Sequence, residues 1–271
     1  MNAYLASFQS RFLLMLQYRA AAIAGFGTQV WFGIVRILIL AAFYRASTHD
    51  QPISLAQAID YVWLGQAFLA FLPWGGDPDV ALGVRSGNIS YDRLRPIDTY
   101  FFWYVRAAGW MTARVVPRAA LMFAFAGVLA PLVGLPDWGL KLPPSFSAFA
   151  LFVVSMVLVV GLSSAIVNLV NAITVMVMTD RGPTLLVSSV VMFFSGNIIP
   201  LPLVPESWRL GMFVQPFAGL VDIPCRIYFG ELQGEMAFFG LALQAFWAVV
   251  FIMLGRWMLE SAMSRLQAQG G

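Results

Sequence analysis

Long runs of hydrophobic residues follow one another along this chain, and polar residues separate them at only a few places. A membrane-spanning helix needs about twenty predominantly apolar residues, and six runs approach that length. They lie near 20–44, 54–72, 101–133, 146–178, 184–199 and 236–258. The pattern predicts an all-α polytopic membrane protein with six transmembrane helices, in a single transmembrane domain over residues 1–271.

The segment in front of the first run has an amphipathic pattern. One helical face carries the side chains of Tyr4, Leu5, Phe8, Phe12, Met15 and Leu16, and the opposite face carries those of Ser7, Ser10, Arg11 and Gln17. Such a pattern is typical of a helix that lies on the membrane surface, so we expect an interfacial helix at 1–19. The alternative is that this segment begins the first span, because Leu13 and Leu14 blur the pattern.

A polar segment at 73–99 separates the second run from the third and has its own helix signals. Asp77 suits an N-cap, Pro78 the first helical position and Gly87 the C-terminal end. These signals predict a short helix at about 78–86, which is either a docking element or an ordinary connector. Asp98 is placed to cap the third span.

The apolar segment from Gly196 to Gly230 cannot form one helix, because five prolines interrupt it, at Pro200, Pro202, Pro205, Pro216 and Pro224. Pro205 and Pro216 are each expected to begin a short helix. Non-helical backbone at membrane depth persists only where it is buried in protein or lines a wet cavity. We therefore expect a re-entrant helical hairpin at 197–235, on the external side before the last span.

The arginines predict the orientation. With both termini in the cytoplasm, the cytoplasmic side receives Arg11, Arg19, Arg85, Arg93, Arg95, Arg106, Arg181, Arg256 and Arg265, and the outside receives only Arg45, Lys141, Arg209 and Arg226. This distribution satisfies the positive-inside bias.

The composition agrees with a membrane protein and argues against other classes. Of 271 residues, 60% are hydrophobic and 11% are charged, which is far from the range of soluble globular proteins. The net charge of +3 gives a polyanion little to bind along, so we expect a lipid bilayer and no nucleic acid around this chain.

Patterns for catalysis and metal binding are missing from the sequence. The one histidine, His49, has no glutamate partner at helical spacing, and the one cysteine, Cys225, excludes an internal disulfide or a thiolate cluster. The one lysine, Lys141, does not belong to a Gly-Lys-Ser/Thr phosphate loop. We therefore expect no catalytic residue, metal site or bound cofactor in this chain, and no ATPase activity of its own.

Four stretches together resemble one known family. They are VRSGNISYDRLRPID (84–98), FFSGNIIPLPLVPESW (193–208), QPFAGLVDIPCRIYFGEL (215–232) and RLQAQGG (265–271). In this order they are similar to the permease subunits of bacterial type-2 ATP-binding-cassette (ABC) exporters, over essentially the whole chain. Each motif is loose, and their joint order is more specific than any one of them.

The resemblance implies a transport subunit in the bacterial cytoplasmic (inner) membrane. It would move an amphiphilic or hydrophobic substrate out of the cytoplasm or inner leaflet. A separate cytosolic ATPase dimer would hold ATP and Mg, and a second permease subunit, the same or a related chain, would complete the path. The alternative is an ion-coupled transporter or lipid scramblase without an ATPase; its usual internal repeat of broken helices is not evident here.

The resemblance also suggests roles for three groups of residues. In the coupling loop at 73–99, apolar contact to the ATPase is expected from Val80, Leu82 and Val84, inside a polar rim of Arg85, Arg93 and Arg95. The external gate is expected to involve Pro200, Trp208, Phe213, Pro216 and Pro224. Candidates for the translocation path are Arg36, Asp60, Ser164, Asn168 and Asn171.

The path candidates each have a structural alternative. Arg36 lies deep enough in its span that it should face protein or water, so it contacts substrate or pairs with Asp60 on the next span. Ser164, Asn168 and Asn171 share one helical stripe beside small residues. Such stripes also hold membrane helices together.

Overall fold

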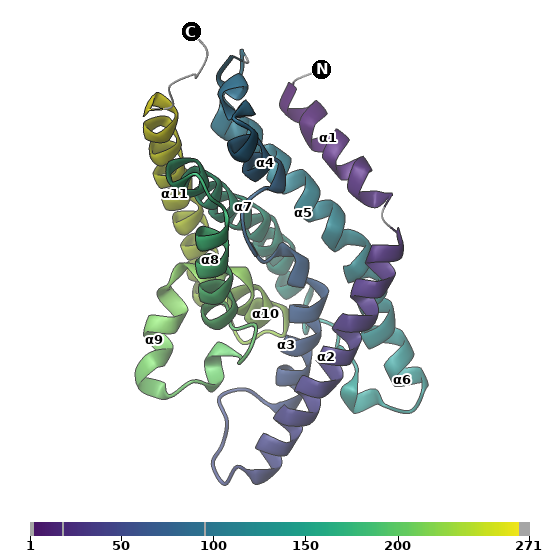
Figure 1. Cartoon of the computed structure of the whole chain (residues 1–271). Helices are drawn as coiled ribbons and strands as arrows, with labels where there is room; N and C mark the ends of the chain where they lie inside the picture. Colours follow the sequence, from purple (N-terminus) through teal and green to yellow (C-terminus); the bar gives the residue numbers. More distant parts are fainter. Residues whose placement is uncertain (1–2, 18, 95, 266–271) are drawn as a thin grey trace.

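The computed structural model describes residues 3–17, 19–94 and 96–265, and every regular element in these ranges is helical (Figure 1). The main helices are α1 (Ala3–Leu16), α2 (Arg19–Ala46), α3 (Leu55–Ala67), α4 (Pro78–Ser86), α5 (Thr99–Ala124), α7 (Phe146–Val177), α8 (Arg181–Phe194), α9 (Glu206–Val214), α10 (Asp222–Tyr228) and α11 (Gly234–Arg265). Short turns complete the set: η1 (Leu69–Phe71), η2 (Asn88–Leu94), the π-helical η3 (Phe125–Leu129), α6 (Ala130–Leu132), η4 (Pro136–Trp138), η5 (Leu201–Leu203) and η6 (Pro216–Leu220).

Within these residues, four helical stretches are long and apolar enough to cross a membrane. They are Ala22–Ala46 in α2, Thr99–Leu132 from α5 to α6, Phe146–Val177 in α7 and Gly234–Ser264 in α11. The other two predicted spans correspond to α3 and α8, which have 13 and 14 residues. Neither reaches the about twenty residues that a helical crossing needs. The structure thus shows four full-length helices where the sequence predicts six.

Local backbone chemistry ends both short helices. After α3, Phe68 leaves helical geometry, η1 follows, and the chain then reaches Pro73, which cannot extend a helix. After α8, Gly196 takes a φ of +86°, a left-handed conformation that glycine tolerates best. The next helical turn comes only after Pro200.

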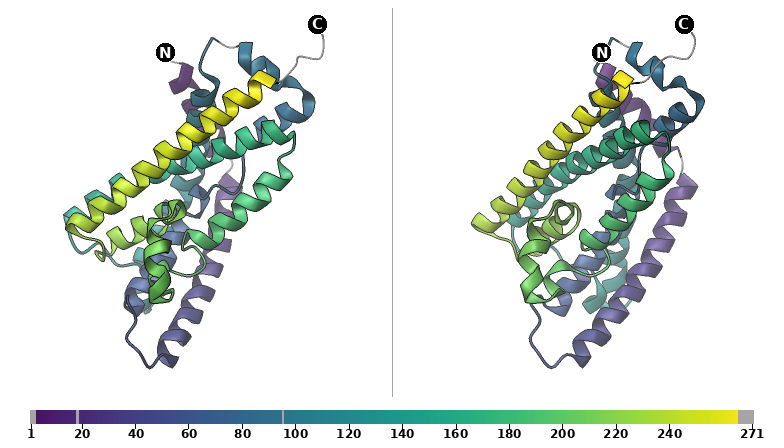
Figure 2. Two further views of the ribbon diagram at one scale, coloured as in Figure 1. Left: turned by 90° about the vertical axis from the view of Figure 1, so that its left-hand side faces the viewer. Right: turned by 60° about the vertical axis from the view of Figure 1, so that its left-hand side comes forward.

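The elements define two ends of the molecule. Figure 1 shows α4 near the start of α1 and the end of α11, and we call this side the α4 end. The opposite side carries α9, α6 and the connection from α2 to α3, and we call it the α9 end. Figure 2 shows α7 and α11 side by side along most of their lengths, in agreement with their extensive contacts.

The main core lies where α3, α5, α7 and α10 meet. Its fully buried side chains include Trp63 on α3, Met111 on α5, Leu162 on α7 and Ile227 on α10. A second, smaller core lies under α4. Burial of such large side chains is the main term that fixes where α4 and α10 sit on the long helices.

Candidate functional site

Helix α4 begins and ends where the sequence predicts. The Asp77 carboxylate accepts a hydrogen bond from the Asp79 backbone N–H, Pro78 occupies the first turn, and Gly87 ends the helix with a φ of +74°. Asp98 likewise caps α5 by accepting from the Phe101 N–H at 2.9 Å. These caps satisfy backbone groups that a free helix end leaves unpaired.

One face of α4 packs on the protein, which corrects part of the docking prediction. Val80 and Val84 are 2% and 3% exposed and pack with Trp103 on α5 and Val175 on α7. Leu82 is 64% exposed. Residues two apart lie on opposite sides of a helix, whereas residues four apart share a face. Val80 and Val84 therefore cannot offer contact to a partner, and Leu82 remains as the outward apolar residue.

The arginines of the predicted rim divide into two groups. Arg85 is exposed and forms an ion pair with Asp180, at the start of α8, at 2.5 Å. The Arg85 guanidinium lowers the pKa of the Asp180 carboxyl below its ordinary value. Arg93 belongs to η2, but its side chain lies outside the described residues, as does all of Arg95.

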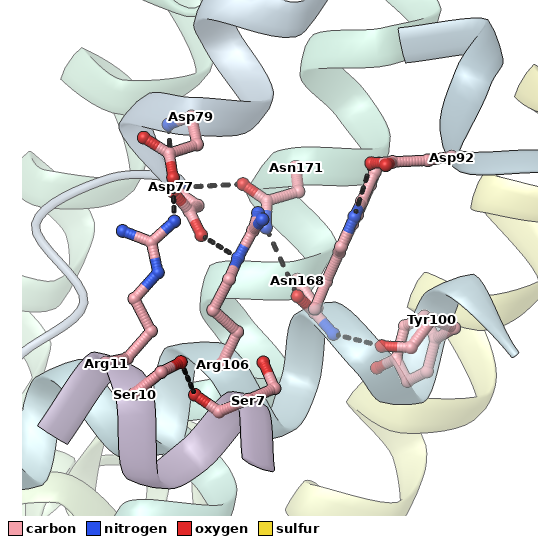
Figure 3. Close-up of polar contacts among 11 residues, drawn as sticks. Ser7, Ser10, Arg11, Asp77, Asp79, Asp92, Tyr100, Arg106, Asn168 and Asn171 are labelled. Carbon is pink, nitrogen blue, oxygen red and sulfur yellow. Dashed lines mark hydrogen bonds and ion pairs between the residues drawn. The ribbon is translucent and has the colours of Figure 1, made fainter. Parts of the chain in front are cut away.

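A buried polar cluster lies directly beneath α4 (Figure 3). Arg106 on α5 forms an ion pair with Asp77 at 2.8 Å, and the two side chains are 10% and 4% exposed. The Asn171 side chain on α7 accepts from the Asp77 backbone N–H at 2.7 Å. The ion pair of Arg106 and Asp77 is not among the sequence-based predictions, although the sequence puts an acidic residue and an arginine on the same predicted side of the membrane.

The cluster continues along α7 and includes two of the path candidates. The Asn171 amide donates to the Asn168 side chain at 3.2 Å, and the Asn168 amide donates to the backbone carbonyl of Tyr100 at 3.0 Å (Figure 3). Ser164, one turn earlier, is fully buried. All three side chains thus lie inside the protein; Asn168 and Asn171 bond α7 to α5 and to the start of α4, whereas the Ser164 hydroxyl has no hydrogen-bond partner within the described residues.

Helix α1 is separate from α2 and packs along α5. A Cβ atom on Gly109 of α5 would lie 2.9 Å from the Phe8 carbonyl oxygen, so the two backbones touch at this point. Arg11 forms an ion pair with Asp79 in the first turn of α4 (Figure 3). The Tyr4 hydroxyl accepts from the Asp98 N–H at 3.2 Å. These contacts connect α1 to both ends of the coupling loop.

Arg36 and Asp60 do not pair with each other. The Arg36 guanidinium donates to the backbone carbonyl of Asn197, which follows the end of α8. Asp60 accepts from the Lys141 backbone N–H at 2.8 Å. The predicted ion pair is therefore wrong, because each side chain instead satisfies non-helical backbone. A cavity of about 300 Å³ adjoins Arg36, Gly65 and Asn197.

The predicted hairpin contains two helices that differ in burial. As expected, α9 follows Pro205 and η6 begins at Pro216. Trp208 on α9 is exposed, whereas Phe213 at its end is buried.

Every residue of α10 except Arg226 is buried, including Pro224, and the helix contacts α3, α7 and α11. Pro200, where the hairpin begins, is also buried.

Buried polar contacts fix α10 and η6 in place. Asp222 pairs with Arg226 at 3.2 Å and accepts from the Tyr61 hydroxyl at 3.1 Å. Arg226 also pairs with Glu231 at 2.8 Å. The Gln244 amide on α11 donates to the carbonyl of Gly219 at 2.7 Å. Such satisfied buried groups rigidify the segment.

Among the described residues, no group of three or more His, Cys, Asp and Glu side chains is arranged to hold a metal ion.

Comparison with known families gives one match. The family model described as ABC-2 family transporter protein matches residues 55–270, from the start of α3 to beyond the end of α11. The chain matches no curated protein. The match includes the coupling loop, the hairpin and every path candidate except Arg36.

Proposed function

Because this chain belongs to the ABC-2 transporter family, in which it is a permease subunit, we propose that it forms the membrane part of an ATP-driven exporter. The cargo is an amphiphilic or hydrophobic molecule, taken from the cytoplasm or the inner leaflet. The observation that carries the proposal is α4. It is capped at both ends, packed on one face against the long helices and open on the other face at Leu82.

The proposed topology has six crossings, with both termini and α4 in the cytoplasm. The short helices α3 and α8 complete their crossings with non-helical backbone. That backbone is buried in protein at Leu72 and Pro73, after η1, and again at Ser195 to Asn197, as the hydrocarbon core requires.

Side chains donate hydrogen bonds to the backbone carbonyls that have no helical partner at these breaks. The Ser163 hydroxyl donates to the Phe71 carbonyl. The Gln215 amide donates to the Phe194 carbonyl at 2.7 Å, and Arg36 donates to that of Asn197. Arg36 thereby has a structural role at the break, and its place beside a cavity keeps it a candidate for cargo contact.

The energy source is proposed to be a separate ATPase. This sequence holds no Gly-Lys-Ser/Thr phosphate loop, so ATP and Mg would bind to a cytosolic ATPase dimer that touches α4. A second permease subunit would provide the other half of the path, and the inner membrane of a bacterium is the proposed location. The hairpin with α9 and α10 would close the outer mouth.

A single substitution tests whether α4 couples the two subunits. Leu82→Asp places a charge on the exposed apolar contact, which a docked partner would desolvate at a cost of a few kcal/mol. The permease should still fold, because the Leu82 side chain is 64% exposed. We expect loss of ATPase binding, or of cargo-stimulated ATP hydrolysis, in the purified complex.

The matched control is Leu142→Asp, which makes the same change at an exposed loop residue near the α9 end. It should leave hydrolysis unchanged. Normal ATPase binding and normal stimulation in Leu82→Asp would remove α4 from the coupling role. Purified permease that transports cargo without any co-purifying ATPase would favour the ion-coupled or scramblase alternative.

A further inference from the structure

A cavity at the α4 end has the chemistry of an anion site. It measures about 760 Å³ and opens between α1, the loop before α4, α5, α7 and α8. Its wall includes two tryptophans, two arginines, three aspartates and two threonines: Trp74, Trp110, Arg11, Arg114, Asp77, Asp79, Asp180, Thr174 and Thr184. This volume is in the range of small-molecule sites.

The carboxylates in the wall are already neutralised. Asp77 pairs with Arg106 and Asp79 pairs with Arg11, as Figure 3 shows. Asp180 pairs with Arg85. None of the three is left to attract a cation into the cavity.

Arg114, unlike these carboxylates, has no ion-pair partner among the described residues. Its side chain is half-buried, and its contact is with the face of the Trp110 ring, 5.1 Å from the centroid. Across residues 3–17, 19–94 and 96–265, the structure gives it no carboxylate and no hydrogen-bond acceptor. Arg118 lies one turn further along α5, where like charges repel. A half-buried guanidinium with such neighbours favours an anion.

Two buried donors in the same wall also lack acceptors. The Trp110 indole N–H and the Thr174 hydroxyl are both buried, and neither has a hydrogen-bond partner within the described residues. Thr174 is only 2% exposed. Leaving a buried donor unpaired is costly, and most such groups in proteins have a partner. An anion with several acceptor oxygens would meet this requirement together with that of Arg114.

The depth of Arg114 matches a lipid headgroup. The stretch from Thr99 to Leu132 has 34 residues, about 51 Å at 1.5 Å per residue. The hydrocarbon core takes about twenty of them. If the core ends near Leu132 at the α9 end, its inner boundary falls close to Arg114. Tryptophans are enriched at this level of a membrane, which suits Trp74 and Trp110.

We propose that this cavity binds the phosphate headgroup of an anionic phospholipid from the cytoplasmic leaflet. Arg114 pairs with the phosphate, the Trp110 N–H and the Thr174 hydroxyl donate to its oxygens, and the tryptophan rings flank the upper acyl chains. The site lies between α1 and the coupling loop, so bound lipid stabilises the position of α4. This inference goes beyond the proposed function, because it requires neither export nor an ATPase.

The test compares the full-length protein in nanodiscs of a neutral digalactosyl lipid, which carries no phosphate, and in the same nanodiscs with added phosphatidylglycerol. Two quantities are measured: the melting temperature and the phosphatidylglycerol retained in native mass spectrometry. Phosphatidylglycerol should raise the melting temperature of the wild type. Arg114→Gln should abolish that rise and reduce retention about tenfold, which corresponds to 1.4 kcal/mol.

The control and a second variant keep the result interpretable. Arg45→Gln removes an exposed arginine at the far end of α2 and should retain the lipid. Thr174→Val, which removes one donor with little change in shape, should lower retention by less than Arg114→Gln does. In the digalactosyl lipid alone, which offers no phosphate, Arg114→Gln should melt no lower than the wild type, because it removes an unpaired charge.

An inorganic phosphate arm identifies the source of the anion. If phosphate alone stabilises the wild type but not Arg114→Gln, the site also accepts the free ion; if only phosphatidylglycerol does, the lipid is the ligand. Two results would overturn the proposal. One is equal phosphatidylglycerol retention by the wild type and Arg114→Gln. The other is an equal loss of melting temperature in both lipids, which would mean a purely structural arginine.

Discussion

The ion pair between Asp77 and Arg106 should control the stability of α4. It joins the helix cap to α5 at 2.8 Å, and both side chains are at least nine-tenths buried. Removing one partner of such a pair leaves an uncompensated buried charge and costs about 3–5 kcal/mol. Arg106→Met should therefore destabilise α4 locally by about this amount. Asp77→Asn should do likewise, although asparagine keeps the N-cap.

The double variant separates pairing from packing. In Asp77→Asn with Arg106→Met no buried charge remains, so much of the loss should be recovered. If the double variant loses no more than one single variant does, the coupling energy is at least one single loss, about 3–5 kcal/mol, which is above the usual range of about 0.5–3 kcal/mol for residues in contact. Hydrogen exchange of the α4 amides, measured by mass spectrometry on the purified permease, reports the local free energy of opening.

An exposed ion pair between α4 and the start of α8 serves as the control. Arg85 and Asp180 are 59% and 29% exposed, and surface pairs contribute about 0–1 kcal/mol. Arg85→Met should therefore change α4 exchange far less than Arg106→Met. Additive losses in the Asp77 and Arg106 double variant, or equal effects of the two arginine substitutions, would refute the reasoning.

Two further predictions concern the surface pair and the hairpin. Arg85 lowers the pKa of Asp180, so this contribution to stability is complete above the unfolded Asp pKa of about 3.9 and is lost as pH falls through the lower folded value. The melting-temperature difference between the wild type and Arg85→Ala should thus be constant from about pH 5 to 7 and shrink below about pH 4; an unchanged difference at pH 3 would contradict it. In a Cys225→Ser background, a cysteine at Leu210, which is 73% exposed, should react with an impermeant thiol reagent much faster than one at Leu220, which is 2% exposed. Equal, rapid labelling would rule out a packed hairpin.

The sequence predicted best those features that depend on neighbouring residues. The bounds of α4 follow from Asp77, Pro78 and Gly87, which act within one or two turns. The beginnings of α9, after Pro205, and of η6, at Pro216, also depend on neighbouring residues. Helical periodicity also separates Leu82 from Val80 and Val84, so their opposite exposure was available from the sequence and was overlooked.

Features that depend on contacts between distant segments were not predictable in this way. Nothing near Asp60 indicates that its partner is the backbone of Lys141, which is 81 positions away. The pair of Asp77 and Arg106 depends on how α4 lies across α5. Helices α3 and α8 were predicted as full-length spans because a hydropathy count considers only how apolar the residues are. It does not show that α3 leaves helical geometry at Phe68.

Helix α7 connects α4 to the buried helix α10 more directly than α5 does. At the α4 end, Asn171 bonds to the backbone of Asp77. Toward the α9 end, Phe152 packs edge-on against Tyr228 of α10, with ring centroids 5.0 Å apart. Within α7, Phe152 and Asn171 are separated by about 28 Å of continuous helix at 1.5 Å per residue.

No proline interrupts α7, whereas α5 contains Pro117 and passes into the π-helical η3. A proline and a π-helical turn are the usual places where a helix bends, so we expect α7 to transmit a displacement of α4 more rigidly than α5 does. In the proposed exporter, motion of α4 therefore reaches the buried face of α10 through α7. Substitutions that bend α7 between Phe152 and Asn171 should then separate ATP hydrolysis from opening at the α9 end without disturbing either end locally.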